Sequence, residues 1–186
     1  MKEPKVVYYE APGKANTEQT LALAIAAARE QGIKNVIVAS SRGGTAELLP
    51  NDPELQFTVV YTTPTYRGKD WMIQPEQAAR LRARGINVFT AAHALSGVER
   101  AFSTDFKGVY PTEVMAHTLR MFGQGTKVCV EIAAMAVDGG YIENGERVVC
   151  VGGTVTGADT AMVLCAAPSH QILKTRIQQY ICKPEL

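Results

Sequence analysis

Short apolar segments alternate with longer segments of helical periodicity along this chain, and this alternation constrains the fold more than any other feature. NVIVAS (35–40) is apolar at successive positions, which is typical of a strand covered on both faces. A helix predicted over 16–31 precedes it, with apolar residues at helical spacing from Leu21 to Ala28 and Gly32 as its stop. Strands joined through helices form parallel sheets, so we expect an open α/β sheet with helices on both faces.

The rest of the chain continues this alternation. FTVVYTT (57–63) and INVFTAA (86–92) are predicted strands, and a helix with proline in its first turn is predicted over 75–85. The connection TPTYRGKDWMIQ (63–74) contains the only Trp, Trp71, and is expected to be a surface loop that could fold over a site. Further helices are predicted over 96–102, 111–123, 127–138 and 169–181, the first helix of the chain being capped by Asn16 and the last by Ser169.

One connection near the C-terminus breaks the pattern. Only the eight residues GGTVTGAD (152–159) separate the predicted strand ending at Val151 from the next strand, TAMVLCAA (160–167). A parallel crossover needs about a dozen residues or more, so this pair is predicted to be an antiparallel hairpin with the reversed strand at the sheet edge. The whole chain, 1–186, is thus expected to form a single three-layer α/β/α domain.

The charge and hydropathy of the chain argue against several partners. The formal net charge is +1, from 19 Lys and Arg against 18 Asp and Glu, so the long-range field that nucleic-acid binders use is missing. No apolar run reaches the ~18 residues that span a bilayer, and the first residues do not resemble a signal peptide. We expect a cytoplasmic protein that binds neither nucleic acid nor membrane; the sequence leaves open whether it forms a homo-oligomer.

The cysteines show no metal or redox pattern. They are far apart, with no C-x-x-C pair and no histidine at metal-ligand spacing. Three of them, Cys129, Cys150 and Cys165, lie in apolar runs, where a thiol behaves as a small buried hydrophobe. No metal site is predicted.

The first candidate site is the SSRGGT segment after the strand at 35–40. Its small residues let the backbone approach an anion, and a following helix start would present free N–H groups. The segment is neither a triphosphate-binding loop nor a G-x-G-x-x-G loop, and the alternative is an ordinary strand-to-helix turn. The candidate phosphate-binding residues, with Arg42 as the cationic partner, are Ser40, Ser41, Arg42, Gly43, Gly44 and Thr45.

The second candidate site is the hairpin connection itself. It is rich in glycine and hydroxyl side chains and longer than the about two to five residues of ordinary hairpin loops, although a plain flexible loop is the alternative. In doubly wound sheets, ligands bind outside the carboxyl ends of strands where the strand order reverses, so the two loops are predicted to face one another. The candidate ligand-binding residues here are Gly152, Gly153, Thr154, Thr156, Gly157, Asp159 and Thr160.

Three further residues are weaker candidates. Lys14 could add a cation to the site, although a turn and a helix cap explain its surroundings. His93 follows the strand at 86–92 and could donate to a ligand or act as an acid–base group, or be structural. Glu131 is unusual within an apolar helix, but it could simply point to water. No nucleophile–base signature is readable in the sequence.

At the two loops the chain resembles the C-terminal domain of pyruvate kinase. In that family a strand leads into a Thr/Ser-x-Ser-Gly-x-Thr/Ser-Ala loop that holds the phosphate of an allosteric effector. Ser40, Gly43, Thr45 and Ala46 match this loop, whereas Arg42 stands where the family has a small hydroxyl residue. The segment VVCVGGTVTGADTAMVLC resembles the penultimate strand, glycine-rich effector loop and final reversed strand of the family.

The resemblance is closest to stand-alone proteins with a pyruvate kinase C-terminal-like domain. They share the patterns SS-x-G-x-T-A, H-x-L-S-G-x-E-R, V-C-V-E-I-x-x-M-A and V-G-G-x-x-x-G-A-D-T-A. The resemblance implies a mostly parallel sheet of order 3-2-1-4-5 with strand 5 antiparallel, counting the predicted strands from 35–40 onward. The catalytic barrel of pyruvate kinase has no counterpart here, so pyruvate kinase activity is not implied.

Two functional hypotheses remain. The first is binding of a phosphorylated small molecule, above all a mononucleotide such as FMN, at the two loops. The second is a flavin-dependent or other small-molecule enzyme that uses the same cleft, in which His93, Glu131 and Trp71 would flank the flavin ring. No catalytic residue is assigned.

Overall fold

The structure is a computed structural model that describes residues 5–62 and 73–185. The predicted surface loop at 63–74, with Trp71, falls almost entirely outside the described residues.

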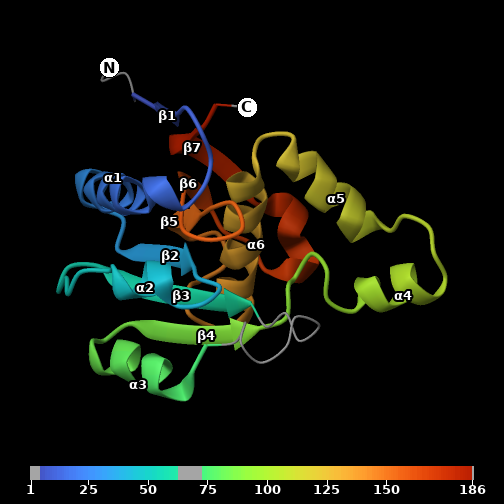
Figure 1. The fold of residues 1–186 in the computed structure, drawn as a ribbon, viewed down its shortest axis with the longest axis horizontal. Helices are drawn as coiled ribbons and strands as arrows, with labels where there is room; N and C mark the ends of the chain where they lie inside the picture. Colours follow the sequence, from blue (N-terminus) through green and yellow to red (C-terminus); the bar gives the residue numbers. More distant parts are fainter. Residues whose placement is uncertain (1–4, 63–72, 186) are drawn as a thin grey trace.

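A single seven-stranded sheet, of order β1-β7-β6-β5-β2-β3-β4, forms the centre of the molecule (Figure 1). Strands β2, β3, β4 and β5 run parallel, β6 runs antiparallel to both of its neighbours, and β1 pairs in parallel with β7. The strands are β1 (Val7–Tyr9), β2 (Asn35–Ala39), β3 (Gln56–Thr62), β4 (Asn87–Ala91), β5 (Arg147–Gly152), β6 (Thr160–Cys165) and β7 (Arg176–Pro184).

The predicted strand order is confirmed. Strands 3-2-1-4-5 of the sequence-based scheme are β4, β3, β2, β5 and β6, in that order across the sheet. The two strands that carry the candidate loops are neighbours, with Val36 opposite Val149 and Val38 opposite Val151. The short connection 153–159 joins β5 to an antiparallel β6, as its length requires.

The predicted C-terminal helix is wrong. Ser169–Lys174 forms only the 3₁₀ helix η4, inside which Gln171 has a non-helical backbone, and Arg176–Pro184 is the strand β7. The physical reason is the open edge of β6, whose backbone N–H and C=O groups need partners that a helix could not supply. Strand β6 is therefore an inner strand, not the edge strand that the sequence predicts, and Ser169 caps no α-helix.

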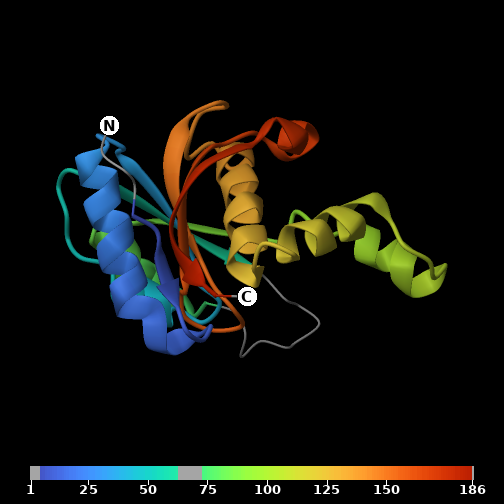
Figure 2. The ribbon, with the colours of Figure 1, turned by 90° about the horizontal axis from the view of Figure 1, so that it is seen from above.

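Helices cover both faces of the sheet, which confirms the three-layer architecture (Figure 2). Helices α1 (Thr17–Glu30), α2 (Gly44–Glu47) and α3 (Pro75–Ala83) pack on one face, and α6 (Gln124–Asp138) packs on the other. Helices α4 (Glu99–Asp105) and α5 (Pro111–Arg120) extend away from the sheet beside α6 (Figure 1). Among the described residues, no helix combines the length and apolar character needed to cross a membrane.

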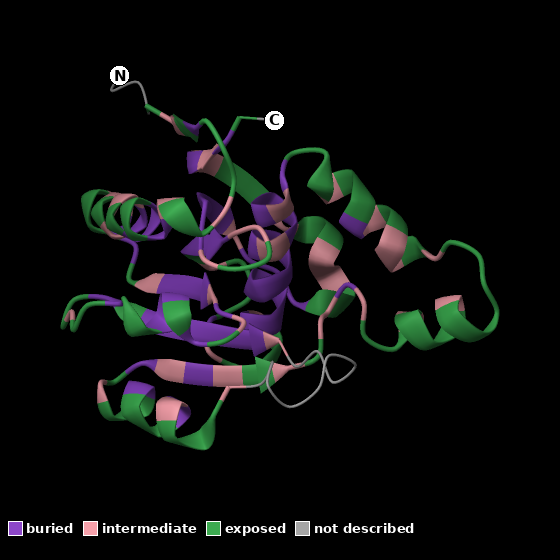
Figure 3. Ribbon diagram, viewed as in Figure 1, coloured by how far each residue is buried: buried purple, intermediate pink, exposed green. Residues whose placement is uncertain are grey.

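Burial is concentrated in the central strands and in α6 (Figure 3). Helix α6 is buried over most of its circumference because it lies between the sheet on one side and α5 and η4 on the other. Cys129 and Cys150 are fully buried in this layer, and burial raises the pKa of both thiols. They are packing residues, as the sequence predicts.

The start of α1 differs from its prediction in one detail. Asn16 belongs to the 3₁₀ turn η1 (Lys14–Asn16) and has a helical backbone conformation, so its side chain cannot reach back to cap the helix. The side-chain amide of Asn16 donates instead to the carbonyl oxygen of Ala11, at 2.7 Å.

The contact between α6 and β6 gives a test of this packing. A Cβ added at Gly125, in the first turn of α6, would stand 2.0 Å from Oγ1 of Thr160. Gly125→Ala should therefore lower the free energy of unfolding by about 1–3 kcal/mol, although alanine is favoured over glycine by ~1 kcal/mol in helices. Denaturant unfolding measures the difference. Gly44→Ala, in the first turn of α2 with no atom within 4 Å of the added Cβ, is the matched control and should not destabilise; a stabilised Gly125→Ala variant would contradict the packing.

Candidate functional site

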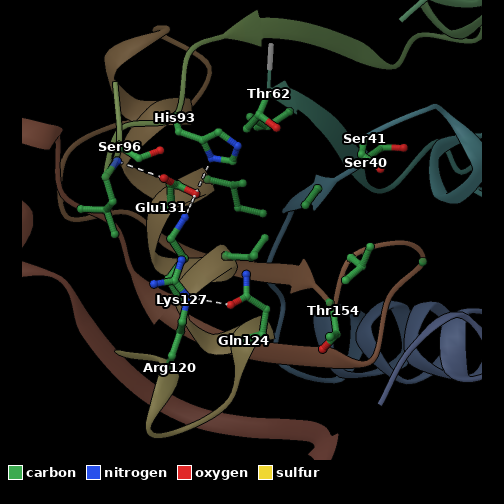
Figure 4. A pocket seen from close by; sticks show the side chains of 18 of the residues that line it. Ser40, Ser41, Thr62, His93, Ser96, Arg120, Gln124, Lys127, Glu131 and Thr154 are labelled. Carbon is green, nitrogen blue, oxygen red and sulfur yellow. Dashed lines mark hydrogen bonds and ion pairs between the residues drawn. The ribbon is translucent and has the colours of Figure 1, made fainter. Parts of the chain in front are cut away.

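A cavity of about 560 Å³ opens at the carboxyl ends of the parallel strands, on the α6 side of the sheet (Figure 4). It lies where the chain leaves β2 toward β3 on one side and leaves β5 toward β6 on the other. This is the switch point at which doubly wound sheets bind ligands. Its walls come from the loops after β2 and β5, the segment 93–96 after β4, and residues of α5 and α6.

Both loops singled out in the sequence reach this cavity, but only part of each lines it. The lining residues from the two loops are Ser40, Ser41, Gly153, Thr154, Val155 and Gly157. The candidate residues that do not line it are Arg42, Gly43, Gly44, Thr45, Gly152, Thr156, Asp159 and Thr160. The ligand-binding role of all of these candidates stays a prediction.

The SSRGGT segment is shaped by contacts on the opposite face of the sheet. Gly43 has a φ of 87°, and a Cβ there would stand 1.9 Å from the side-chain nitrogen of Gln77 in α3. Glycine is required at this position because the backbone is left-handed and α3 approaches closely. Helix α2 spans a single turn, and Arg42 is exposed to solvent.

The start of the same segment buries two hydroxyl groups. Oγ of Ser40 and the hydroxyl oxygen of Tyr61 are both inaccessible to solvent. Alternation along β2 and β3 places both side chains on the face covered by α1 and α3. Burial raises the pKa of Tyr61 to about 12, so its hydroxyl stays protonated at neutral pH.

Asp159 organises the loop after β5. Its carboxylate accepts hydrogen bonds from the N–H of Gly13 at 2.9 Å, the N–H of Thr154 at 3.1 Å and the hydroxyl of Thr160 at 2.8 Å. The buried carboxylate therefore ties the loop to the connection before α1, and its acceptors are engaged within the protein. It holds the loop in place at the cavity rim.

The tip of this loop is strained. Val155 has a φ of 62° and is 76% exposed, and the N–H of Thr156 donates to the carbonyl oxygen of Thr154 across it at 2.7 Å. A three-residue turn of this hand is rare, and a β-branched residue with positive φ is an outlier. Backbone strain of this kind is concentrated at ligand-binding sites, and Val155 lines the cavity.

A buried carboxylate forms the opposite wall. The side chain of Glu131 in α6 is 1% exposed and receives hydrogen bonds from the N–H of Leu95 at 2.9 Å and from Nδ1 of His93 at 3.0 Å. Nζ of Lys127, one turn earlier on α6 and 5% exposed, donates to the same oxygen as His93. Figure 4 shows these side chains pointing toward one another.

These partners determine the charge state of Glu131. Burial alone would raise the pKa of its carboxyl, but the hydrogen bond from His93 and the positive charge of Lys127 outweigh burial and hold the pKa well below its usual range. Glu131 is thus ionised at neutral pH and can only accept hydrogen bonds. Neutral His93 must then carry its proton on Nδ1, which leaves a lone pair on Nε2.

Positive side chains dominate the lining of the cavity. Among the described residues, the lining contains the cationic side chains of Lys127, Arg100 and Arg120 and one carboxylate, that of Glu131. Arg120, the last residue of α5, donates from Nε to the side-chain oxygen of Gln124 at 2.8 Å. Hydroxyl groups of Ser96, Thr62 and Thr154 belong to the same lining. Within residues 5–62 and 73–185, no group of His, Cys, Asp and Glu could hold a metal ion.

The sequence singled out part of this wall and missed the rest. His93 and Glu131 were identified as weak candidates, and the structure brings them into direct contact. Lys127 was missed, although a lysine four residues before a glutamate in an otherwise apolar helix signals a buried pair. Arg120 carries no such signal, because only the packing of α5 against α6 brings it to the cavity. Lys14 does not line it.

The free energy of unfolding tests the interaction between Lys127 and Glu131. Glu131→Leu should lower the free energy of unfolding by about 3–5 kcal/mol, since it leaves the Lys127 ammonium buried without a counter-charge. The double variant Lys127→Met/Glu131→Leu should regain a large part of this loss, because no isolated charge remains. Denaturant unfolding of wild type, both single variants and the double variant measures the coupling; strictly additive losses would show that the two residues do not interact.

The lowered pKa of Glu131 also predicts an acid effect. A carboxyl with a lower pKa in the folded than in the unfolded chain stabilises the fold fully above the unfolded pKa, about 4.3. This stabilisation is lost as the pH falls through the folded pKa. The difference in free energy of unfolding between wild type and Glu131→Gln should therefore narrow as the pH drops from about 5 toward 2. Denaturant unfolding at each pH measures this difference. A difference that is constant over this range would contradict the assignment.

Comparison with known proteins identifies the fold family. The sequence matches the alpha/beta domain of pyruvate kinase over residues 18–164. Two structures of a pyruvate kinase from Cryptosporidium parvum, one in complex with ADP, align with the chain at 16% identity and TM-scores of 0.41 and 0.37. The alignments cover 80% and 78% of this chain but 22% of each pyruvate kinase, so the chain spans less than a quarter of the length of those enzymes. Since the family match extends over well more than half of its residues, the chain belongs to the pyruvate kinase alpha/beta domain family.

Proposed function

We propose that this protein binds a phosphorylated small molecule in the cavity between the two loops and α6. The observation that carries the proposal is the composition of the cavity: cationic side chains on one wall face hydroxyl groups and glycine backbone on the other. The volume of about 560 Å³ lies within the range of about 300–1,000 Å³ typical of small-molecule sites.

The charge of the ligand follows from its surroundings. Lys127 is almost buried, and only one of its three N–H donors is needed for Glu131. Arg120 adds a guanidinium at the same wall, while Thr154 supplies a hydroxyl from the opposite loop (Figure 4). A phosphate has enough acceptor oxygens to engage such donors together, and charge-assisted hydrogen bonds are the strong ones.

A mononucleotide such as FMN is the specific ligand that we propose. Leu95, Val128 and Ile132 contribute apolar surface to the cavity, which suits a planar ring attached to the phosphate-bearing chain. The His93 imidazole lies at the same wall. The proposal is one of binding, and it assigns no pyruvate kinase activity to this chain.

The first test is the identity of whatever ligand the purified protein carries or takes up. A yellow preparation that releases FMN on denaturation would support the proposal, as would a rise in melting temperature with added FMN. A colourless protein that a sugar phosphate stabilises and FMN does not would replace FMN by a sugar phosphate as the ligand.

The second test distinguishes a phosphate bound in the cavity from a phosphate bound on the SSRGGT loop that the sequence predicts. Arg120→Ala should weaken binding of the phosphorylated ligand by about 1.5 kcal/mol or more, roughly tenfold, through loss of a charge-assisted hydrogen bond. Calorimetry measures the affinity, and Arg176→Ala, at the far end of β7, is the matched control and should bind like wild type. If Arg42→Ala weakens binding and Arg120→Ala does not, the phosphate lies on the SSRGGT loop outside the cavity. Unchanged affinity in both variants would show that neither guanidinium contacts the phosphate.

A further inference from the structure

His93 and Lys127 are held together by Glu131 in an arrangement that binding of an anion alone does not need. Both groups bond the same oxygen of Glu131, so an imidazole and an ammonium stand next to each other at the cavity wall. We propose that this protein is an enzyme in which His93 removes a proton from the carbon beside the carbonyl group of a phosphorylated aldehyde or ketone. The inference rests on the proposed phosphate site, but it takes a phosphorylated carbonyl compound in place of FMN as the occupant, and it adds a reaction.

His93 has the properties of a general base. Its Nδ1 is committed to an ionised carboxylate, so the lone pair of the neutral ring lies on Nε2. Within the described part of the chain, Nε2 has no hydrogen bond, and the side chain is 28% exposed where it lines the cavity. An imidazole held in one tautomer with its second nitrogen toward a cavity is poised to accept a proton.

Lys127 supplies the complementary acidic group. A carbon–hydrogen bond next to a carbonyl ionises readily only when a donor stabilises the negative charge that develops on the oxygen. The ammonium of Lys127 retains two donors beyond its bond to Glu131. The acidic hydrogen and the carbonyl oxygen sit on adjacent carbons, so the base and the cation must lie at the same wall of the cavity, as His93 and Lys127 do.

The surroundings of His93 favour a base that acts on the ligand over one that activates a protein nucleophile. No serine, threonine or cysteine of the described residues is hydrogen-bonded to its ring. The Cys129 and Cys150 thiols are fully buried, and burial raises the pKa of each. A nucleophile–base pair, which covalent catalysis needs, is therefore not formed at this wall.

The step balances without any co-reactant. The carbon–hydrogen bond breaks, its electron pair forms the double bond of an enolate, and the carbonyl oxygen becomes negative beside Lys127. The proton moves to Nε2 of His93, and the resulting imidazolium is balanced by Glu131. Return of the proton to the same carbon regenerates the substrate with hydrogen exchange. If that carbon also carries a hydroxyl group, the hydroxyl proton can move to the former carbonyl oxygen and the proton on His93 can return to the former carbonyl carbon, which gives the isomeric carbonyl compound.

Exchange with deuterated water tests this step without knowledge of the final product. The purified protein is incubated in D₂O with dihydroxyacetone phosphate, ribose 5-phosphate and, for comparison, unphosphorylated dihydroxyacetone, and proton NMR follows loss of the hydrogen next to the carbonyl. Wild type should exchange at least one phosphorylated compound at least about 100-fold faster than His93→Gln, the range that a general base contributes. Glutamine keeps a donor for Glu131, so this variant should fold and should bind the same compound within about threefold of wild type.

The controls separate the reaction from binding and from contamination. Arg176→Ala, prepared in parallel, should exchange like wild type, because it lies at the other end of the sheet. Equal exchange in wild type and His93→Gln would assign the activity to a contaminant and overturn the proposal. Calorimetric binding of the phosphorylated compounds without exchange would overturn catalysis and leave the binding function intact. The absence of both binding and exchange with all of these compounds would overturn the proposed reaction, and the rise in melting temperature with added FMN then tests the binding function by itself.

The positioning role of Glu131 has its own readout. Nitrogen-15 NMR of the imidazole should show His93 as the Nδ1–H tautomer at neutral pH, because the ionised carboxylate can only accept. A predominant Nε2–H tautomer, or an imidazolium protonated on both nitrogens, would leave no lone pair for the base and would overturn the proposal.

Discussion

The buried carboxylate of Glu131 is the interaction on which the site depends. A charge in the interior is tolerated only when it is paired and hydrogen-bonded, and this one has a lysine, a histidine and a backbone N–H as partners. The N–H comes from Leu95, so the segment after β4 is fastened to α6 through a side chain. Removal of this charge would detach the segment after β4 from α6, and it would also leave His93 and Lys127 without their shared partner.

The fold brings these groups together through its strand order. Four parallel strands end at one edge, and the reversal between β2 and β5 leaves room there for a cavity that helices do not fill. The glycine-rich loop after β5 is held by Asp159 on one side of this space, and Glu131 holds the other side. Two buried carboxylates thus fix the opposite walls, and the cationic and hydroxyl groups of the lining lie between them.

Much of the fold and less of the site could be predicted from the sequence, for physical reasons. Central strands such as 35–39 are apolar on both faces, and the short 152–159 connection admits only a hairpin, so local pattern and chain length suffice. The segment at 169–181 has helical spacing, but it forms the 3₁₀ helix η4 and the first part of β7, since pairing with β6 outweighs local propensity. Arg120 reaches the cavity only through packing of α5 on α6, which no local pattern encodes.

The pairing of β1 with β7 has a consequence for how the molecule assembles. This ladder joins Val7 to Cys182 and Tyr9 to Pro184, residues from opposite ends of the described chain. Contacts of such sequence separation have a high loop-closure entropy and are slow to form unless intervening structure has already brought the partners together. The outer strands should therefore join the sheet last, after the β2–β5 centre has formed. During synthesis, β1 remains unpaired until nearly the whole domain has left the ribosome, because its partner β7 is made last.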